Sequence, residues 1–343
     1  MPGPSDALLR VRGLRTRFLT GHGVVHAVND VSFSVRRGET LALVGESGCG
    51  KTAAMLSVLR LLPARRARVD ADEVTFRGRD LLSLDDEGMR RVRGAEVAMI
   101  FQDPRASLNP VLTIGRQLTE SLQVHLGLGR REARERAVEL LDTVGIPRAN
   151  ERIEDYSHQF SGGMCQRVTI AMALACDPVL LIADEPTTAL DVTVQAQILD
   201  LVTELRAERR MAMIWISHDL SVVASLADRV AVMYAGSIVE TAPAGRLFHA
   251  PAHPYTRALL ASLPALGDGG RKHLTAIRGQ PPDMTTPPGG CTFAERCPHV
   301  FERCKREVPP LLEAGHGARA ACWWDVRLRR ERTPDGSRES HVR

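Results

Sequence analysis

The sequence predicts an α/β fold in which strands alternate with helices, and three observations carry the prediction. A glycine-rich segment at residues 45–52 stands between an apolar run at 41–44 and a helix-forming run at 53–59. A second apolar run ends in two acidic residues, Asp184 and Glu185. Further strand-like and helix-like segments then alternate, which is typical of a doubly wound sheet with helices on both faces.

The N-terminal region is predicted to consist of strands. Residues 8–11 and 27–35 alternate apolar and polar side chains, as strands with one buried face do. A turn at 37–39 precedes the apolar run that enters the glycine-rich segment.

The glycine-rich segment has the pattern of a phosphate-binding loop. It consists of Gly45, Glu46, Ser47, Gly48, Cys49, Gly50, Lys51 and Thr52. Glycines allow backbone conformations that other side chains block, so successive amides can point into one concavity at the start of a helix, where an anion is favoured. Lys51 supplies a cation for the β- and γ-phosphates of a nucleotide, and Thr52 supplies a hydroxyl to Mg²⁺.

The base of such a nucleotide needs a stacking partner. Phe18 is the candidate for stacking on an adenine ring, and His22 and His26 are alternatives. Simple packing of Phe18 against the rest of the protein is the competing interpretation.

Polar residues at strand ends complete a candidate hydrolytic site. Gln102 follows the predicted strand at 97–101, and Asp184 and Glu185 follow another. We expect Gln102 and Asp184 to contact Mg²⁺, and Glu185 to polarise an attacking water as general base. His218 follows a further apolar strand and is placed to hydrogen-bond the γ-phosphate.

Residues from about 105 to 178 are predicted to form a helical insertion. Between 130 and 144, apolar residues recur at helical spacing among Arg and Glu. The insertion contains the triplet Ser161, Gly162 and Gly163, ahead of another predicted helix.

Together these motifs resemble the motif set of an ABC-transporter ATP-binding subunit, over roughly residues 8–265. The motifs are the loop at 45–52 and Gln102, Ser161, Gly162, Gly163, Asp184, Glu185, Asp191 and His218. The resemblance implies a P-loop NTPase core of the ABC type that hydrolyses ATP with Mg²⁺. It also implies that two such cores close face to face, so that residues 161–163 bind the γ-phosphate of ATP held by the second core through amides at a helix N-terminus.

Beyond Pro243 the proline and glycine content rises, which predicts a linker into a small appended module. Segments at 253–256, 279–282 and 290–297 resemble the C-terminal extension of dipeptide and oligopeptide importers, and nickel importers share much of it. Four cysteines cluster in this extension: Cys291, Cys297, Cys304 and Cys322.

These four cysteines have several interpretations. A cytosolic location disfavours disulfides, and the close Cys-x₂₋₄-Cys pair of structural zinc sites is absent. Four thiolates on a loop-rich segment suit an iron–sulfur cluster, and the resemblance implies a 4Fe-4S cluster in members with all four cysteines. Zinc and free thiols stay open. We expect the ATPase core, folded around its own sheet, to keep its nucleotide affinity when Cys297 is replaced.

The composition is ordinary for a globular protein of 343 residues, with 44% hydrophobic and 25% charged residues. A net charge of +4 is compatible with an anionic membrane surface and does not demand nucleic acid. The N-terminus lacks an apolar signal segment, and no apolar run is long enough to span a bilayer. We therefore expect a peripheral protein at the cytoplasmic face of the membrane, with other chains spanning it.

The predicted domains are an ABC ATPase domain at 1–265, the cysteine-containing extension at 266–325 and a disordered tail at 326–343. The predicted function is to energise the import of dipeptides or oligopeptides. The alternatives are an importer of nickel or another small solute, and a soluble ABC ATPase outside transport. The expected partners are a second ATPase subunit (identical or a paralogue), two transmembrane permeases and an extracytoplasmic substrate-binding protein, with no nucleic acid.

Overall fold

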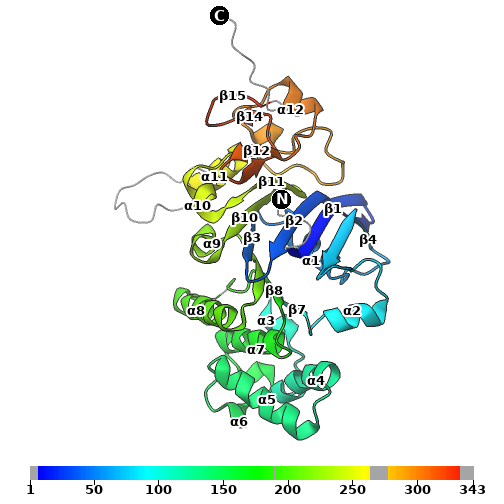
Figure 1. The fold of residues 1–343 in the computed structure, drawn as a ribbon, viewed down its shortest axis with the longest axis vertical. Coiled ribbons are helices and arrows are strands. Elements are labelled where there is room, and N and C mark those ends of the chain that lie inside the picture. The colour runs from blue at the N-terminus through cyan, green and yellow to red at the C-terminus, as the bar shows by residue number, and fades with distance from the viewer. Residues whose placement is uncertain (1–6, 189, 263–276, 333–343) are drawn as a thin grey trace, which may run out of the picture. The chain divides into compact units, whose positions relative to one another are not determined.

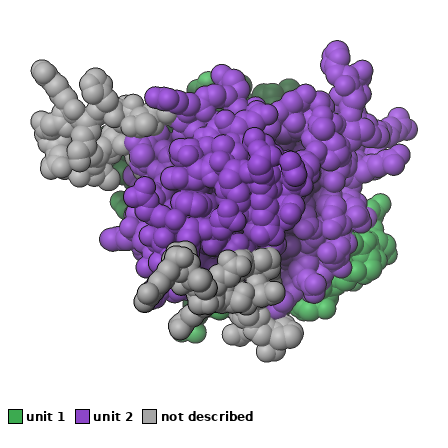
Figure 2. All heavy atoms as spheres, turned by 90° about the horizontal axis from the view of Figure 1, so that it is seen from above, with its two compact units in different colours: residues 1–9, 34–40, 75–216 green, residues 10–33, 41–74, 217–343 purple. Residues whose placement is uncertain are grey.

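The computed structural model describes residues 7–188, 190–262 and 277–332. The chain divides into two compact units, coloured separately in Figure 2. Unit 1 comprises residues 1–9, 34–40 and 75–216, and unit 2 comprises residues 10–33, 41–74 and 217–343. Each unit therefore combines distant parts of the chain, and neither coincides with a predicted domain.

Unit 1 contains three strands that pair in parallel, of which β7 and β8 are labelled in Figure 1. Strand β8 (Leu180–Asp184) pairs on one side with β7 (Val97–Ile100) and on the other with β9 (Ala212–Ser217). Every residue of β8 and β9 is buried, which explains their continuous apolar sequences. The predicted strands at these positions are confirmed to within two residues. A short hairpin joins β5 (Glu73–Phe76) to β6 (Arg79–Asp80).

The helices of unit 1 include the predicted insertion. They are α2 (Asp86–Val92), α3 (Pro104–Ser107), α4 (Ile114–Leu126), α5 (Arg130–Thr143), α6 (Ala149–Arg152), η1 (Ser157–Gln159), α7 (Gly162–Leu174) and α8 (Val192–Arg209). Helix α5 buries Ala133, Ala137, Leu140 and Leu141, the apolar face that the sequence periodicity indicates. Helices α4, α5 and α7 pack against one another.

The main sheet of unit 2 carries the strand that leads into the glycine-rich loop. Strand β10 (Arg229–Tyr234) pairs in parallel with β3 (Thr40–Val44) and antiparallel with β11 (Ser237–Pro243). The predicted hairpin between β10 and β11 is confirmed. The extension adds to this sheet, because β13 (Ala318–Ala320) pairs with β11 and β12 (Leu312–Gly315) pairs with β13.

Further strands and helices lie wholly or mainly in unit 2. The strands are β1 (Ala7–Thr20), β2 (Gly23–Arg36) and β4 (Ala67–Asp70), of which β1 and β4 pair antiparallel. The helices are α1 (Lys51–Val58), α9 (Leu220–Leu226), α10 (Ala244–His249), α11 (Pro254–Ala261), η2 (Ala294–Arg296) and α12 (Glu302–Arg306).

Part of the predicted disordered tail is structured. Strands β14 (Trp324–Asp325) and β15 (Arg330–Glu331) pair antiparallel. Val326 and Arg332 are buried, and Arg332 Nε donates to Asp325 Oδ2 at 3.3 Å. Sequence composition misses these contacts because arginine-rich segments are commonly solvated. Residues 333–343 lie outside the described residues.

Candidate functional site

The glycine-rich loop of unit 2 requires glycine at two positions. Gly45 and Gly50 have φ values of 152° and 102°, which side chains disfavour. A Cβ at Gly45 would also collide with the carbonyl oxygen of Met233, and one at Gly50 with that of Ala27. The loop therefore wraps against neighbouring backbone, and α1 begins directly after it at Lys51.

Lys51 and Thr52, the predicted phosphate and metal ligands of the loop, are the first two residues of α1. Lys51 is buried, and its Nζ donates to the carbonyl oxygens of Gly45 at 2.8 Å and Glu46 at 3.0 Å. Thr52 is exposed on the first turn of α1. Cys49 is buried beside Lys51, and burial raises the pKa of its thiol, so this side chain stays neutral. The loop thus combines a held cation, an exposed hydroxyl and a helix N-terminus, which fit a nucleotide phosphate chain.

Unit 1 brings together two of the predicted hydrolytic residues. Gln102 Nε2 donates to Glu185 Oε2 at 3.1 Å, and Thr188 Oγ1 donates to the same oxygen at 3.1 Å. Glu185 has a φ of 47°, and its backbone N–H donates to the carbonyl oxygen of Ile216. Non-glycine residues in this conformation are often found where a side chain is aimed for function. Asp184 is buried at the end of β8, directly before Glu185.

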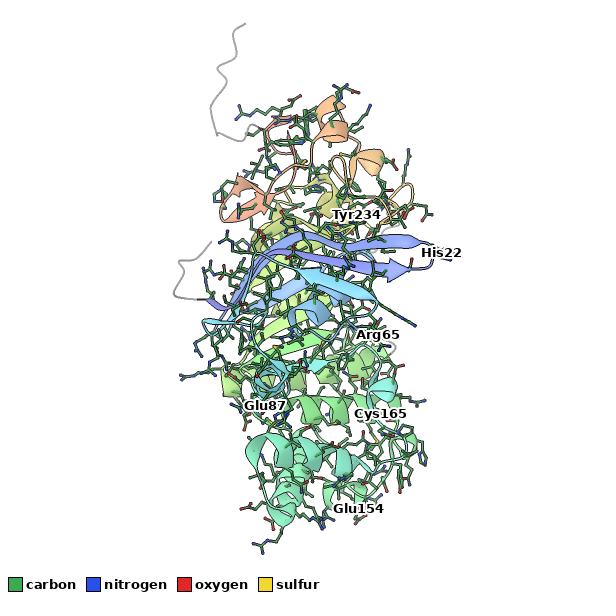
Figure 3. The ribbon with its side chains drawn as sticks, turned by 90° about the vertical axis from the view of Figure 1, so that its right-hand side faces the viewer. His22, Arg65, Glu87, Glu154, Cys165 and Tyr234 are labelled. Carbon is green, nitrogen blue, oxygen red and sulfur yellow. The ribbon has the colours of Figure 1, made fainter. Side chains whose placement is uncertain are left out.

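The triplet predicted to act on a second nucleotide begins helix α7. Ser161 caps this helix by accepting a hydrogen bond from the Met164 amide at 3.3 Å. A Cβ added at Gly162 would meet nothing within 4 Å, whereas one at Gly163 would lie 2.8 Å from Val194 Cγ1. A side chain at position 163 would therefore crowd Val194, whereas there is free space around the backbone of Gly162. Farther into α7, Cys165 is buried (Figure 3).

The remaining predicted residues have locally defined positions. Asp191 caps α8 by accepting from the Val194 amide at 2.9 Å, a role that the sequence analysis did not foresee. Phe18 is half-buried on β1, where its Cα pairs with that of Ala67 on β4. His218 is exposed between β9 and α9. The nucleotide roles of Phe18, Asp191 and His218 stay predictions.

The four cysteines of the extension line one enclosed cavity of about 10 Å³ in unit 2, with Trp323 and Trp324 among the other lining residues. The amides of His299 and Trp324 donate to the sulfur atoms of Cys297 and Cys322, both at 3.4 Å. Burial raises the pKa of the Cys291 thiol to about 11 and that of Cys322 to about 12.

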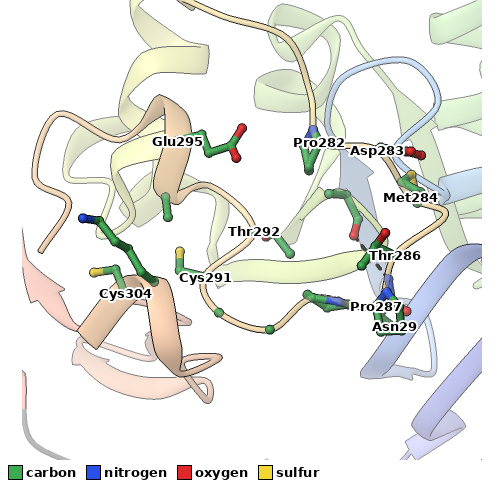
Figure 4. Close-up of a pocket in the computed structure, with 16 residues that line it drawn as sticks. Asn29, Pro282, Asp283, Met284, Thr286, Pro287, Cys291, Thr292, Glu295 and Cys304 are labelled. Atoms are coloured by element: carbon green, nitrogen blue, oxygen red, sulfur yellow. Dashed lines mark hydrogen bonds between the residues drawn. The ribbon is translucent and has the colours of Figure 1, made fainter. Parts of the chain in front are cut away.

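All four cysteines are free thiols, so no disulfide links the sulfur atoms around the cavity. Within the described residues, no group of three or more His, Cys, Asp or Glu side chains is arranged so that it could hold a metal ion. A larger open cavity of about 290 Å³ has Cys291 and Cys304 on its wall (Figure 4).

Comparison with known proteins agrees with this arrangement. Residues 28–188 match the family described as "ABC transporter", and residues 239–304 match "Oligopeptide/dipeptide transporter, C-terminal region". The chain is 52% identical to a putative peptide import ATP-binding protein of Brucella melitensis, covering 93% of this chain and 98% of the relative. It is 49% identical to the dipeptide transport ATP-binding protein DppD of Bacillus subtilis, covering 93% and 95%.

Solved structures give the same class of fold. The dimeric structure of a bacterial ABC transporter cassette superimposes with a TM-score of 0.61 at 25% identity, covering 69% of this chain and 98% of the other. A related dimer in a post-hydrolysis state, bound to ADP and phosphate, gives a TM-score of 0.62 at 25% identity, with the same coverage.

The fold and the glycine-rich loop thus define an ABC ATPase that binds and hydrolyses ATP. The chain belongs to the ATP-binding proteins of ABC transporters, in the oligopeptide/dipeptide branch. Among the residues that the structure describes, no helix is long and apolar enough to cross a membrane.

Two functional contacts were missed by the sequence analysis. Tyr255, on α11, and Arg296, in the extension, both form hydrogen bonds with Glu46 in the phosphate-binding loop. Tyr255 lies in a segment that the family resemblance marks, but nothing in the sequence links either residue to the loop.

Proposed function

We propose that this ATPase energises the import of dipeptides or oligopeptides. One observation carries the proposal: the chain combines an ABC core with the oligopeptide/dipeptide C-terminal region. In addition, about half of its residues are identical to those of peptide import proteins over nearly its whole length. Import of nickel or another small solute is the second candidate. A non-transport ABC ATPase would have no need of this C-terminal region.

The assembly that such a protein needs follows from its single core. We propose that it closes against a second ATPase subunit, identical or a paralogue, and docks at the cytoplasmic face of the membrane on two permeases served by an extracytoplasmic binding protein. The dimeric form of one similar cassette, seen in two solved structures, supports the closure of two cores.

In the proposed reaction, the loop at 45–52 holds the phosphates and Phe18 stacks on the adenine. Thr52, Gln102 and Asp184 would hold Mg²⁺, which offsets the charge of the phosphates when bound. Glu185 accepts a proton from the attacking water, and Gln102 orients the Glu185 carboxylate through their hydrogen bond.

The other predicted residues act at the margins of this site. His218 assists at the γ-phosphate. Residues 161–163 and Asp191 present the N-termini of α7 and α8 to the nucleotide of the second subunit.

We also propose that the four cysteines of the extension hold a 4Fe-4S cluster. Their positions around one cavity, and the backbone N–H hydrogen bonds to two of the sulfur atoms, support a cysteine-ligated group. In a cluster each cysteine binds a different iron, so the sulfur atoms surround the group and do not converge on one ion.

The iron content of the protein tests the cluster. Anaerobically purified protein should be brown, lose its colour in air and lose iron in a Cys297→Ser variant. Colourless protein with one tightly bound zinc, or with no metal and four alkylatable thiols, would refute the cluster.

The transport proposal is tested with the complete complex in proteoliposomes. Dipeptides or oligopeptides, with the binding protein, should stimulate ATP hydrolysis, and Lys51→Ala should abolish the stimulated activity by weakening nucleotide binding. Stimulation by nickel and not by peptides would favour the second candidate. Recovery of the purified chain with nucleic acid and without permeases would contradict transport altogether.

A further inference from the structure

Glu46, the second residue of the phosphate-binding loop, is held from three sides. Its carboxylate accepts two hydrogen bonds from the Arg296 guanidinium, at 2.8 and 3.1 Å. Its backbone N–H donates to the Tyr255 hydroxyl at 3.0 Å, and its carbonyl oxygen accepts from Lys51 Nζ at 3.0 Å. Arg296 ends η2 and Tyr255 lies on α11. Two of the three contacts therefore come from α11 and from the extension that follows it.

Arg296 is fixed in place by its own surroundings. Its side chain is only 5% exposed, and its Nε donates to the carbonyl oxygen of Arg278 at 3.0 Å. The guanidinium also donates to the hydroxyl of Tyr234 (Figure 3) at 3.2 Å and lies over the rings of Tyr234 and Phe293. These contacts hold the bidentate Arg296–Glu46 pair in a single arrangement, unlike an ion pair between exposed side chains.

The charge of Glu46 gives this pair its importance for nucleotide binding. A carboxylate within a phosphate-binding loop repels the phosphates that the loop must hold, and the repulsion is strong where water is partly excluded. The Glu46 side chain is 25% exposed, so solvent screens it incompletely. Arg296 neutralises this charge at contact distance. Without Arg296, the loop would keep a partly buried and unpaired anion.

Arg296 is also next to the cysteine cavity, both in the sequence and through its packing. It directly precedes Cys297, and Phe293, which packs beneath its guanidinium, lines the same cavity as the four cysteines. The Cys291 amide donates to the Cys304 carbonyl oxygen at 2.7 Å, which closes this segment onto α12. Loosening the cavity would therefore loosen the support of Arg296.

We propose that Arg296 is a positioning residue for the phosphate-binding loop. It neutralises and orients Glu46, and it thereby makes ATP affinity depend on the folding of the extension around its cysteines. The inference rests on the ATP-binding role of residues 45–52 and is independent of what the cysteines hold. It reverses the sequence-based expectation that the ATPase core keeps its nucleotide affinity when the cysteine module is disturbed.

The charge component is tested with a double-mutant cycle in the full chain. Arg296→Gln should weaken Mg-ATP binding about tenfold, and raise KM with kcat changed less than threefold. Glu46→Gln alone should have a small effect, because it removes both the charge and the need to neutralise it. In the double variant Glu46→Gln/Arg296→Gln, affinity should return to within about twofold of Glu46→Gln. A purely structural role of Arg296 would not be rescued by removing its partner.

Unchanged ATP affinity in Arg296→Gln, or failure of the double variant to recover, would overturn the proposal. If Arg296→Gln does not fold, Arg296→Lys keeps the charge without the bidentate geometry and should weaken binding less than tenfold. In that case, the proposal would be refuted if Arg296→Lys and the double variant Glu46→Gln/Arg296→Lys both bound ATP with wild-type affinity. Wild-type protein that fails to bind ATP would instead refute the assigned nucleotide site.

The link to the cysteines is tested at a distance from Arg296. Cys322→Ser should weaken ATP binding by a similar factor, and it should add nothing further in the Arg296→Gln background. The matched control is Glu302→Gln, which removes exposed ion pairs with Lys305 and Arg306 on α12 and should leave ATP affinity unchanged. Cys322→Ser protein with wild-type ATP affinity and an opened cysteine cavity, detected by thiol alkylation, would overturn the link.

Discussion

Replacing Glu185 by Gln should abolish turnover while preserving the local structure. Gln102 and Thr188 both donate to Oε2, so the glutamine amide should turn its oxygen toward these donors and place its NH₂ group at the position of Oε1. The backbone bond from residue 185 to Ile216 is unaffected. The variant then keeps these bonds and lacks the group that accepts a proton. Loss of a general base lowers rates by about 10²–10⁴-fold, equivalent to about 2.7–5.5 kcal/mol of barrier.

The assay compares steady-state ATP hydrolysis with Mg-ATP binding and ATP-driven dimer closure. Turnover should fall by the stated factor, and closed dimers should accumulate. The control is Thr188→Val, which removes one donor to the carboxylate and keeps the base, so it should cost about tenfold or less. Hydrolysis by Glu185→Gln within a few-fold of wild type would refute the assignment of Glu185. So would a larger loss in Thr188→Val than in Glu185→Gln.

Two further predictions concern closure and stability. Gly162→Asp should fold normally and bind nucleotide, because a Cβ there meets nothing within 4 Å. It should block ATP-driven closure, which light scattering measures. Gly163→Ala should instead lower the melting temperature, because its Cβ would crowd Val194. Glu240 is buried and accepts two backbone N–H groups, so Glu240→Gln should leave one donor unpaired and cost about 1–3 kcal/mol in denaturant unfolding. Burial raises the pKa of Glu240, so its native state binds more protons than the unfolded state above pH 4.5. Its contribution to stability should therefore fall as pH rises through the folded pKa, and a wild-type slope that persists in Glu240→Gln would contradict this.

The sequence could predict those parts of the site that are local or follow from strand order. The phosphate-binding loop is contiguous, and its glycine pattern encodes the close backbone approach at Gly45 and Gly50. Gln102 and Glu185 are 83 residues apart, yet both follow apolar strands. The carboxyl ends of neighbouring parallel strands lie at one edge of a sheet, so their contact could be expected from the alternation of strands and helices.

Contacts that depend on long-range packing could not be predicted in this way. Arg296 and Glu46 are separated by 250 residues, and Arg296 is one of 45 basic residues with no local pattern to distinguish it. The proline- and glycine-rich composition of the extension predicts irregular backbone, and we interpreted this as a separate module. Irregular backbone does not imply independence, since β13 pairs with β11 within the main sheet of unit 2.

The contacts of Arg296 and Tyr255 change how the charge of Glu46 is interpreted. From the sequence alone, Glu46 is a charged side chain between Gly45 and Ser47, and its charge opposes the function of its loop. With the extension in place, the same charge becomes an attachment point, because Arg296 bonds to the Glu46 carboxylate and Tyr255 bonds to its backbone N–H. A buried ion pair adds little net stability compared with apolar packing. Its value here lies in removing a net negative charge from the phosphate-binding loop, and the two hydrogen bonds to a planar guanidinium also orient that loop residue. The extension is therefore part of the nucleotide-binding apparatus of this chain, and disturbing it should alter ATP affinity before it alters the fold of the sheet.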